Sequence, residues 1–499
     1  MEPNADIPNN ISTKVDDNLA YLKDFFGNGI NLIQSRYEIL KNQVPAALVY
    51  IDTVADKELI MNHLVKPLFE CSNLSYQGTN NILLFIKSRI ISATETKQVN
   101  EMSQVVEHIL NGDTVLFIEQ TNAAIIVGTR KVEKRPIEPP ENESTILGSQ
   151  ESFTDDLKVN CSLILKRLPV PILKFEEFTV GTLSCTKVKL IWLEGVANTD
   201  AINEARRRIQ SINIDQVDGI GVLSELIEDR PISLFPKYRQ TERPDMAARA
   251  LTNGRFVIIS SNSPFAFIAP ITLWESFKTM DDYEDRFLSS SYLRITRYIA
   301  FLLSIFISAI YLSFVTYNQQ IVPQALALDI AAGREGVALP SVLEMLLLTF
   351  AITIIREAGL RMPSAVGYFV GTLSAVIIGQ VIVTAGYFSA ALIIVVAVCT
   401  ISSFAISTTT MLYPARLLNF AFIILAGCFG MFGVICGISF LFWYLCTLES
   451  FGLPYLYPLI PYDKNGLGDV FVRSPLSTLK KRMKSLAPKN QTRSGARNQ

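Results

Sequence analysis

The stretch YIAFLLSIFISAIYLSFVTY, Tyr298–Tyr317, divides the chain into two unlike halves. It carries no charge, and its length of about 20 residues is enough for a helix to cross the ~30 Å apolar core of a bilayer. Arg294 and Arg297 precede it, and the next basic residue is Arg334. The positive-inside rule therefore predicts that residues 1–297 lie in the cytoplasm.

Charges become rare beyond this point. Over the whole chain 18% of residues are charged, below the roughly 25% of an average soluble protein. The charged residues between positions 298 and 448 are Asp329, Arg334, Glu335, Glu344, Arg356, Glu357, Arg361 and Arg416. A purely soluble protein, a collagen-like chain and a mostly disordered chain are therefore excluded. The net charge of −1 gives no sign of a nucleic-acid-binding protein.

Four further apolar regions follow the first span. They are Ser341–Ile355, Val366–Gly386, Ala390–Ile406 and Leu418–Leu448. Five crossings would place the basic C-terminal tail outside, against the positive-inside rule. We therefore expect an even number of crossings. Either Ser341–Ile355 is re-entrant, or Leu418–Leu448 folds as a short hairpin that breaks at one of its glycines, Gly427, Gly430 or Gly433.

The first half contains an internal duplication. LVYIDTVA (Leu48–Ala55) pairs with LIWLEGVA (Leu190–Ala197), and both are apolar runs that end in an acid before a turn. GDTVLFIEQTNAAIIVG (Gly112–Gly128) pairs with GRFVIISSNSPFAFIAP (Gly254–Pro270), and both have the pattern of a β-hairpin. The two matches share an offset of 142 residues, which favours a repeated unit over chance.

These patterns predict an α/β cytoplasmic half made of two duplicated small subdomains, followed by an α-helical multi-span transmembrane domain. Helical patterns follow the first strand of each copy, and Asn198 or Thr199 is the expected N-cap in the second. The predicted segments are a polar N-terminal segment (1–40), a first subdomain (41–135), a linker and connecting helix (136–180), a second subdomain (181–290), a transmembrane domain (291–448) and a basic cytoplasmic tail (449–499).

Signs of catalysis are missing from the sequence. Neither copy resembles a phosphate-binding or dinucleotide-binding motif, and no nucleophile or acid–base group is apparent. His63 and His108 have no partner spaced for zinc, so we expect no metal and no cofactor. The seven cysteines are expected to be reduced thiols rather than disulfides. The three arginines Arg206–Arg208 fit either a solvated helix face or a subunit contact. The protein is predicted not to be an enzyme.

The region Val366–Gly386 carries the most suggestive helical pattern. Small residues recur at every fourth position and form one smooth face: Gly367, Gly371, Ala375 and Gly379. Such faces let helices approach closely within lipid. Gln380 and Thr384 are polar groups that need a partner or water there. This helix is therefore either a packing seam with an inter-helix hydrogen bond, or the lining of a pore in an oligomer.

The charges between Ile330 and Pro363 also allow two readings. Glu344 would cost at least ~2.5 kcal/mol if it faced lipid at the bilayer centre, so we expect it to face a partner or a water-filled path. Arg334 and Glu335 are expected near the outer surface, and Arg356 and Glu357 near the inner one. These residues either anchor the helices through ion pairs, or Glu335 or Glu344 contributes to a negative ring that attracts cations.

Several blocks resemble one known family. REGVALP (Arg334–Pro340) and REAGLRMP (Arg356–Pro363) are similar to the signature of the GerA family of spore germination proteins, with Gly333 in place of the more usual alanine. Other blocks agree: Gly148–Leu168, Phe235–Asp245, Asn253–Pro270, Asp281–Phe287 and Pro458–Pro475. In the first of these, Ser149–Ser152 departs from the family's usual residues. The resemblance spans about residues 40–475.

The resemblance implies a role that composition alone does not. It implies the A subunit of a nutrient germinant receptor, located in the inner membrane of the bacterial spore. The implied partners are a transporter-like B-type subunit that binds the germinant and a C-type lipoprotein subunit. The A subunit is expected to form a homo-oligomer, a pentamer, and to act as a nutrient-gated ion channel whose cation release triggers germination.

Joining the two lines of reasoning gives one hypothesis. The small-residue face packs helices around a shared axis, and Gln380, Val381, Val383 and Thr384 are the candidates for pore and gate, since apolar side chains close a path by excluding water. The alternatives are a membrane transporter or solute-release component, and a non-conducting scaffold for a nutrient-binding partner. A transporter usually shows inverted repeats in its membrane segments, and no such repeat is evident.

Overall fold

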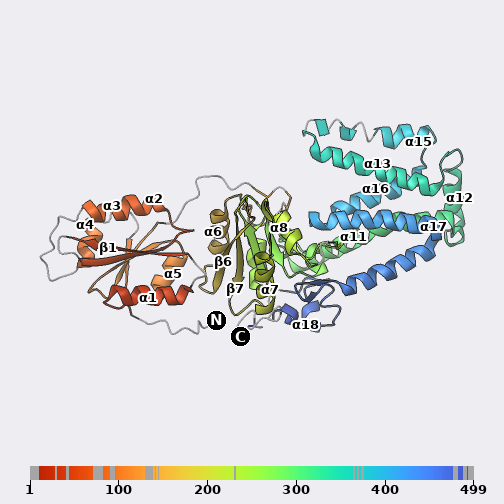
Figure 1. Cartoon of the computed structure of the whole chain (residues 1–499). Coiled ribbons are helices and arrows are strands. Elements are labelled where there is room, and N and C mark those ends of the chain that lie inside the picture. Colours follow the sequence, from red (N-terminus) through yellow and green to blue (C-terminus); the bar gives the residue numbers. More distant parts are fainter. Residues whose placement is uncertain are drawn as a thin grey trace. The chain divides into compact units, whose positions relative to one another are not determined.

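The computed structural model describes residues 10–27, 31–40, 44–70, 82–89, 96–129, 139–140, 142–143, 145, 147–229, 232–363, 366–367, 370–372, 376–475, 481–486, 490 and 492 (Figure 1). The chain divides into two compact units. One comprises Met1–Pro231, Gln240–Pro270 and Leu479–Gln499, and the other comprises Ile232–Arg239 and Ile271–Thr478. The first unit is α/β and the second is helical, as the sequence predicted.

Two five-stranded sheets form the first unit. The first has the order β1-β2-β4-β5-β3, with β1 (Leu32–Ile39), β2 (Val44–Ile51), β3 (Thr96–Val99), β4 (Thr114–Ile118) and β5 (Ala124–Val127). The second has the order β6-β7-β9-β10-β8, with β6 (Leu173–Val180), β7 (Thr186–Leu193), β8 (Arg239–Thr241), β9 (Phe256–Ser260) and β10 (Ala266–Ala269). The identical order confirms the predicted duplication.

The two copies correspond almost residue by residue. Strands β2 and β7, β4 and β9, and β5 and β10 all begin 142 residues apart. Gly112 and Gly254, also 142 apart, adopt φ angles of 90° and 92°, a region that glycine enters without strain. Asn18 and Asn160 occupy the same place, and each exchanges two hydrogen bonds with the backbone of the residue six positions earlier. The duplication therefore includes loop contacts that no strand pattern reveals.

Apolar strands explain where the cores lie. Every residue of β4, β5, β9 and β10 is buried, because these central strands are covered on both faces. The helices of the first copy are α1 (Val15–Phe26), α2 (Lys57–Ile60), the π-helical turn η2 (Met61–Val65), α3 (Lys66–Glu70), α4 (Ile82–Arg89) and α5 (Met102–Leu110). Those of the second are α6 (Leu157–Arg167), α7 (Thr199–Gln210), α8 (Gly219–Ile227) and α9 (Pro244–Thr252).

Local signals set several helix ends. Asn198 is the N-cap of α7, and its side chain accepts a hydrogen bond from the backbone N–H of Asp200, which confirms one of the two expected caps.

Each sheet begins earlier than the sequence analysis placed it. Strand β1 precedes residue 41 and β6 precedes residue 181. The sequence matches began at the second strand of each copy, so the first strand went unrecognised.

The helical unit runs from η4 (Leu273–Phe277) and α10 (Asp281–Glu284) into the long α11 (Phe287–Thr316). Then follow η5 (Gln319–Ile321), α12 (Gln324–Ala332), α13 (Ser341–Arg361), η6 (Ile377–Val381), α15 (Ile382–Thr384), α16 (Ala390–Phe404) and α17 (Thr409–Thr447). The C-terminal elements are β11 (Glu449–Ser450), β12 (Leu453–Pro454), α18 (Lys464–Leu467) and, in the first unit, η7 (Lys484–Leu486). Among the described residues, α11 and α17 are long and apolar enough to cross a membrane.

The chain reverses direction inside α17. Gly430 has φ 61° and ψ −145°, a conformation that favours glycine and interrupts the helix. A Cβ atom at Gly437 would lie 2.6 Å from the ring of Phe422, whereas a straight helix would separate these residues by about 22 Å. The two arms of α17 therefore contact each other near the turn at Gly430 and spread apart toward their other ends (Figure 1).

The ends of α17 support the reversal. Thr408, just before the helix, donates a hydrogen bond to the carbonyl oxygen of Ser276, and Ser450, just after it, accepts one from the backbone N–H of Ile271. Both ends thus contact the short segment that precedes α11. This geometry is the hairpin that one of the two routes required for Leu418–Leu448.

Candidate functional site

A cluster of buried charges lies at the start of α11. We name it the junction cluster: Glu275, Lys278, Asp282, Arg294, Arg297 and Asp469. The carboxylate of Asp282 accepts hydrogen bonds from Arg294 Nε at 3.1 Å and from Arg297 Nη2 at 2.6 Å. The side chains of Asp282 and Arg294 are 1% and 0% exposed. Such burial is tolerated because each charge meets an opposite one.

Asp469 completes the junction cluster from the C-terminal segment. It accepts hydrogen bonds from Arg294 Nη1 at 2.9 Å and from the Tyr283 hydroxyl at 2.7 Å, and it lies 3.4 Å from Lys278 Nζ. Lys278 also donates to Glu275 at 2.8 Å. Three cations therefore face three carboxylates, and the cluster is electrically balanced.

The pKa values of the junction cluster reflect this pairing. Burial alone would raise the pKa of Asp282, but the guanidinium groups of Arg297 and Arg294 outweigh it and hold that pKa below its ordinary value of 3.8. The pKa of Asp469 is lowered in the same way, with burial opposed by Lys278 and Arg294. For Lys278, burial would lower the pKa, but Asp469 and Glu275 raise it above 10.5. All three groups are therefore ionised near neutral pH.

Sequence reasoning found only part of this cluster. It used Arg294 and Arg297 as orientation signals, and it did not connect them with carboxylates. The acids belong to blocks already noted for their resemblance to a family, Asp281–Phe287 and Pro458–Pro475. A search for charges inside those two blocks could have identified Asp282 and Asp469 as partners of α11.

Glu344 lies inside the helical unit. It is 0% exposed, and its carboxylate accepts a hydrogen bond from the backbone N–H of Ser389 at the start of α16. The guanidinium of Arg334 lies 4.0 Å away and also donates to the hydroxyl of Ser341. Glu344 thus meets partners within its own chain. Glu335 is exposed, and its role in attracting cations stays a prediction.

The charges at the end of α13 fall into two environments. Glu357 and Arg361 form an exposed ion pair of 2.8 Å, four residues apart on one helix face. The guanidinium of Arg356 is half-buried and lies 4.7 Å from the centre of the Phe404 ring. Both residues of the Glu357–Arg361 pair belong to α13, which ends at Arg361. The helix therefore extends beyond Ile355, where the sequence analysis ended this segment.

The predicted pore residues lie on an exposed part of the helical unit. Gln380 and Thr384 are exposed, and the Thr384 hydroxyl donates to the backbone oxygen of Gln380 at 2.9 Å. Val383 is half-buried; for Val381 the structure describes the backbone alone. All four lie within or directly after the π-helical turn η6. Their role in a gate stays a prediction.

The small-residue face is described at three of its four positions. Among the described residues, a Cβ atom built at Gly367, Gly371 or Gly379 would meet no atom within 4 Å apart from its chain neighbours and its own helix backbone. Ala375 lies outside the described residues. The described part of this face is therefore open to contacts from outside the chain.

The structure also describes the arginines and cysteines that the sequence analysis singled out. Each of the three arginines Arg206–Arg208 pairs with a carboxylate of the same unit, which leaves a subunit contact as a prediction. The described cysteines Cys161, Cys185, Cys399, Cys428, Cys436 and Cys446 are free thiols. Within the described residues, no group of three or more His, Cys, Asp or Glu side chains could hold a metal ion.

Comparisons with known proteins agree with the resemblance noted in the sequence. The family described as Bacillus/Clostridium GerA spore germination protein matches residues 20–485. The uncharacterized membrane protein YfkQ of Bacillus subtilis (strain 168) is 35% identical over 482 residues, 97% of this chain and 93% of that protein. Spore germination protein KA of the same bacterium is 33% identical, over 97% of this chain and 89% of that protein.

Two further matches extend this set. Spore germination protein GerLA of Bacillus cereus is 32% identical over 94% of this chain and 95% of its own length. Among solved structures, the N-terminal domain of the A subunit of the Bacillus megaterium spore germinant receptor GerK3 has 25% identity and a TM-score of 0.41 and covers 53% of this chain. The family match and the full-length relatives show that this chain belongs to the GerA family of spore germination proteins.

Proposed function

We propose that this chain is the A subunit of a nutrient germinant receptor and that its copies assemble into a nutrient-gated channel for cations. Family membership supports the first part, because relatives named spore germination proteins align over nearly the whole chain. The observation that carries the second part is the small-residue face: Gly371 and Gly379 are exposed, and a Cβ atom added at Gly367, Gly371 or Gly379 would find open space among the described residues. An uncharged, glycine-lined surface suits packing against copies of itself in lipid.

The helical unit supports a membrane location. Helices α11 and α17 have mean hydropathies of 2.3 and 2.4 over their most apolar windows. The reversal at Gly430 supports an even number of crossings, which suits a cytoplasmic position for both terminal regions. We assign the protein to the inner membrane of the spore, with a transporter-like B-type subunit and a C-type lipoprotein as its partners.

Gating would act on an equilibrium between closed and open assemblies. Val381 and Val383 narrow the path in the closed state and exclude water, while Gln380 and Thr384 offer polar groups to ions in the open state. Nutrient binding to the partner subunit favours the open state only through its higher affinity for that state. Such a mechanism requires no nucleophile or general base.

Ion flux from liposomes tests the channel. The purified full-length protein is reconstituted with potassium inside, and efflux is measured for the unchanged protein, for Val383→Ser and for the matched control Val398→Ser. Val398 is 37% exposed on α16, outside the proposed path. We expect Val383→Ser alone to raise basal efflux, because a hydroxyl admits water to an apolar constriction. Equal efflux from all three proteins contradicts the channel.

The mass of the intact membrane complex tests assembly separately. A closed ring of identical subunits supports the channel, and a pentamer is the expected form. A monomer favours the alternatives, a transporter or solute-release component or a non-conducting scaffold. Flux and stoichiometry together therefore separate the three functions.

A further inference from the structure

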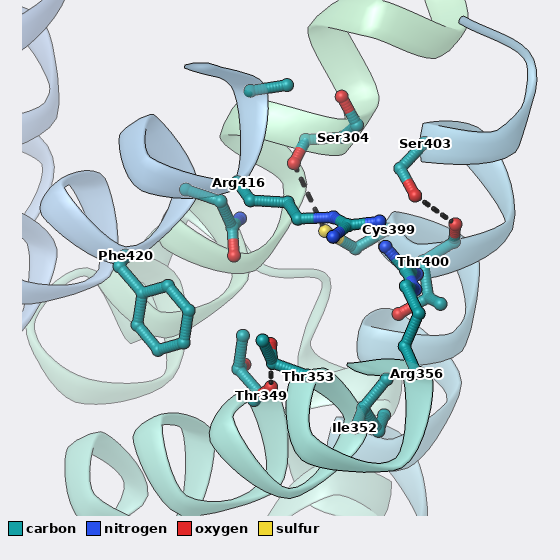
Figure 2. A pocket seen from close by; sticks show the side chains of 12 residues that line it. Ser304, Thr349, Ile352, Thr353, Arg356, Cys399, Thr400, Ser403, Arg416 and Phe420 are labelled. Atoms are coloured by element: carbon teal, nitrogen blue, oxygen red, sulfur yellow. Dashed lines mark hydrogen bonds between the residues drawn. The ribbon is translucent and has the colours of Figure 1, made fainter. Parts of the chain in front are cut away.

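A small pocket lies among four helices of the helical unit. It is formed by residues of α11, α13, α16 and α17 and has a volume of about 40 Å³. A cavity of this kind needs roughly 10–15 Å³ to hold one water, so the pocket has room for a small polar group. Figure 2 shows the side chains of Arg356 and Arg416 pointing into it from different helices. We call it the two-arginine pocket.

The positive charges of the two-arginine pocket are unbalanced. Among the residues that the structure describes, neither Arg356 nor Arg416 forms an ion pair with a carboxylate. Glu357 attracts Arg416 from a distance, but its own ion pair is with Arg361. The guanidinium groups of Arg356 and Arg416 repel each other. Two partly desolvated cations are therefore held together with no carboxylate at ion-pair distance among the described residues.

Two buried polar atoms of the pocket also lack a partner. They are Arg416 Nε and the hydroxyl oxygen of Thr349, which find no hydrogen-bond partner among the described residues. The neighbouring hydroxyls of Thr353 and Ser403 are satisfied, since each donates to a backbone oxygen of its own helix. Both orphaned groups can donate a hydrogen bond. A pocket with two cations and two unused donors is built for an acceptor that carries negative charge.

We propose that the two-arginine pocket binds a phosphate-class oxyanion. Guanidinium groups match the oxygens of phosphate in geometry as well as charge, and they lose less hydration than an ammonium group. The orphaned Thr349 hydroxyl supplies a further donor. This inference is independent of the channel, because it requires only the four packed helices.

The surroundings favour a lipid headgroup as the source of the phosphate. Residues next to the pocket lining carry large apolar side chains that are strongly exposed: Phe350 (56%), Ile354 (53%), Phe404 (66%) and Leu417 (60%). An acyl chain would cover such side chains while its headgroup phosphate reached the arginines. Free inorganic phosphate offers the same oxygens without this apolar contact.

Binding measurements on the full-length protein test the proposal. Delipidated protein in detergent micelles is titrated with phosphatidylglycerol, and bound lipid is counted by native mass spectrometry. A parallel titration with inorganic phosphate follows the unfolding temperature against potassium chloride of equal ionic strength. The variants are Arg356→Gln and Arg416→Gln, with Arg361→Gln as the matched control, since Arg361 lies on the same helix as Arg356 but is exposed and paired.

We expect each pocket variant to weaken phosphatidylglycerol binding about tenfold or more, because each removes charge-assisted hydrogen bonds. Arg361→Gln should leave binding within about twofold of the unchanged protein, as expected for an exposed pair. Loss of the phosphate response alone, in the same pattern, supports the proposal with free phosphate as the source. Equal binding by all variants, or no binding of either probe to the unchanged protein, overturns it.

A double lysine variant guards against a folding defect. Arg356→Lys with Arg416→Lys keeps both charges, and lysine binds phosphate as a point charge. This variant should bind at least one probe more tightly than Arg356→Gln with Arg416→Gln does. A folded double lysine variant that binds neither probe overturns the proposal as well.

Discussion

The helical unit contains two sites where arginines meet, and they differ in charge balance. In the junction cluster, Arg294 and Arg297 share three carboxylates with Lys278. In the two-arginine pocket, Arg356 and Arg416 meet hydroxyl groups and aromatic rings instead. A balanced cluster is satisfied within the chain and holds segments together. A pair of arginines without carboxylate partners can still bind an anion from outside the chain.

Breaking the balance of the junction cluster should have the largest effect. Asp282→Asn leaves Arg294 and Arg297 with one carboxylate fewer in a buried site, which should lower the free energy of unfolding by about 3–5 kcal/mol. Chemical denaturation in detergent micelles measures this change. The control is Glu284→Gln, an exposed acid two residues away, which should shift stability by less than about 0.5 kcal/mol. Equal effects would mean that burial of the ion pair is not decisive.

Acid should weaken the junction cluster without any mutation. The pKa values of Asp282 and Asp469 are lower in the folded chain than their ordinary value of 3.8. Their contribution to stability is therefore complete above that value and is lost as the pH falls through the lower folded values. Unfolding curves recorded from about pH 6 down to about pH 3 should show a loss of stability. In Asp282→Asn, part of this loss should be missing.

Removing an arginine from the two-arginine pocket should change the free energy of unfolding much less than removing one from the junction cluster. Arg416→Met removes a cation that forms no ion pair within the described part of the chain, so the free energy of unfolding of the ligand-free protein should change by less than about 1 kcal/mol, or increase. Arg294→Met, the corresponding change in the junction cluster, should cost about 3–5 kcal/mol because Asp469 loses a buried partner. Comparable losses for the two variants would remove the distinction between the sites.

The smallest effect is expected at a single hydroxyl. Thr349→Val replaces an orphaned buried hydroxyl with a methyl group of similar shape, so the ligand-free protein should lose less than about 0.5 kcal/mol, or gain stability. Thr353→Val, one turn later, removes a hydroxyl that is hydrogen-bonded to its own helix, and it should cost up to about 1 kcal/mol. A larger loss at Thr349 would show that its hydroxyl already has a partner.

The sequence predicted the repeated unit because strands leave a local pattern. Two short matches at one offset were enough, and the copies share strand order as well as the φ angles of Gly112 and Gly254. The long apolar stretches likewise predicted α16 from its first residue, Ala390, and the end of α11, whereas α11 begins earlier, at Phe287, in a stretch that carries charges. Periodicity and composition are properties of neighbouring residues, so one sequence reveals them.

Long-range charge pairing left no such pattern. Arg294 and Asp469 are 175 residues apart, and nothing in the spacing of either residue points to the other. The meeting of Arg356 with Arg416 depends in the same way on how α13 packs near α17. A hairpin in Leu418–Leu448 was one of two open routes, beside a re-entrant Ser341–Ile355, and any of three glycines could have supplied its break. Which distant residues meet, and at which glycine the helix breaks, become visible only in the folded chain.

The return of α17 on itself has a consequence for biosynthesis. Thr408 and Ser450, at the two ends of this hairpin, both form hydrogen bonds with the short segment before α11. The chain therefore leaves the hairpin close to where it entered. If the hairpin inserts into a bilayer, its two arms would enter as a pair. In a bilayer, such a reversal would spare the lysines and arginines after Leu448 from crossing the apolar core.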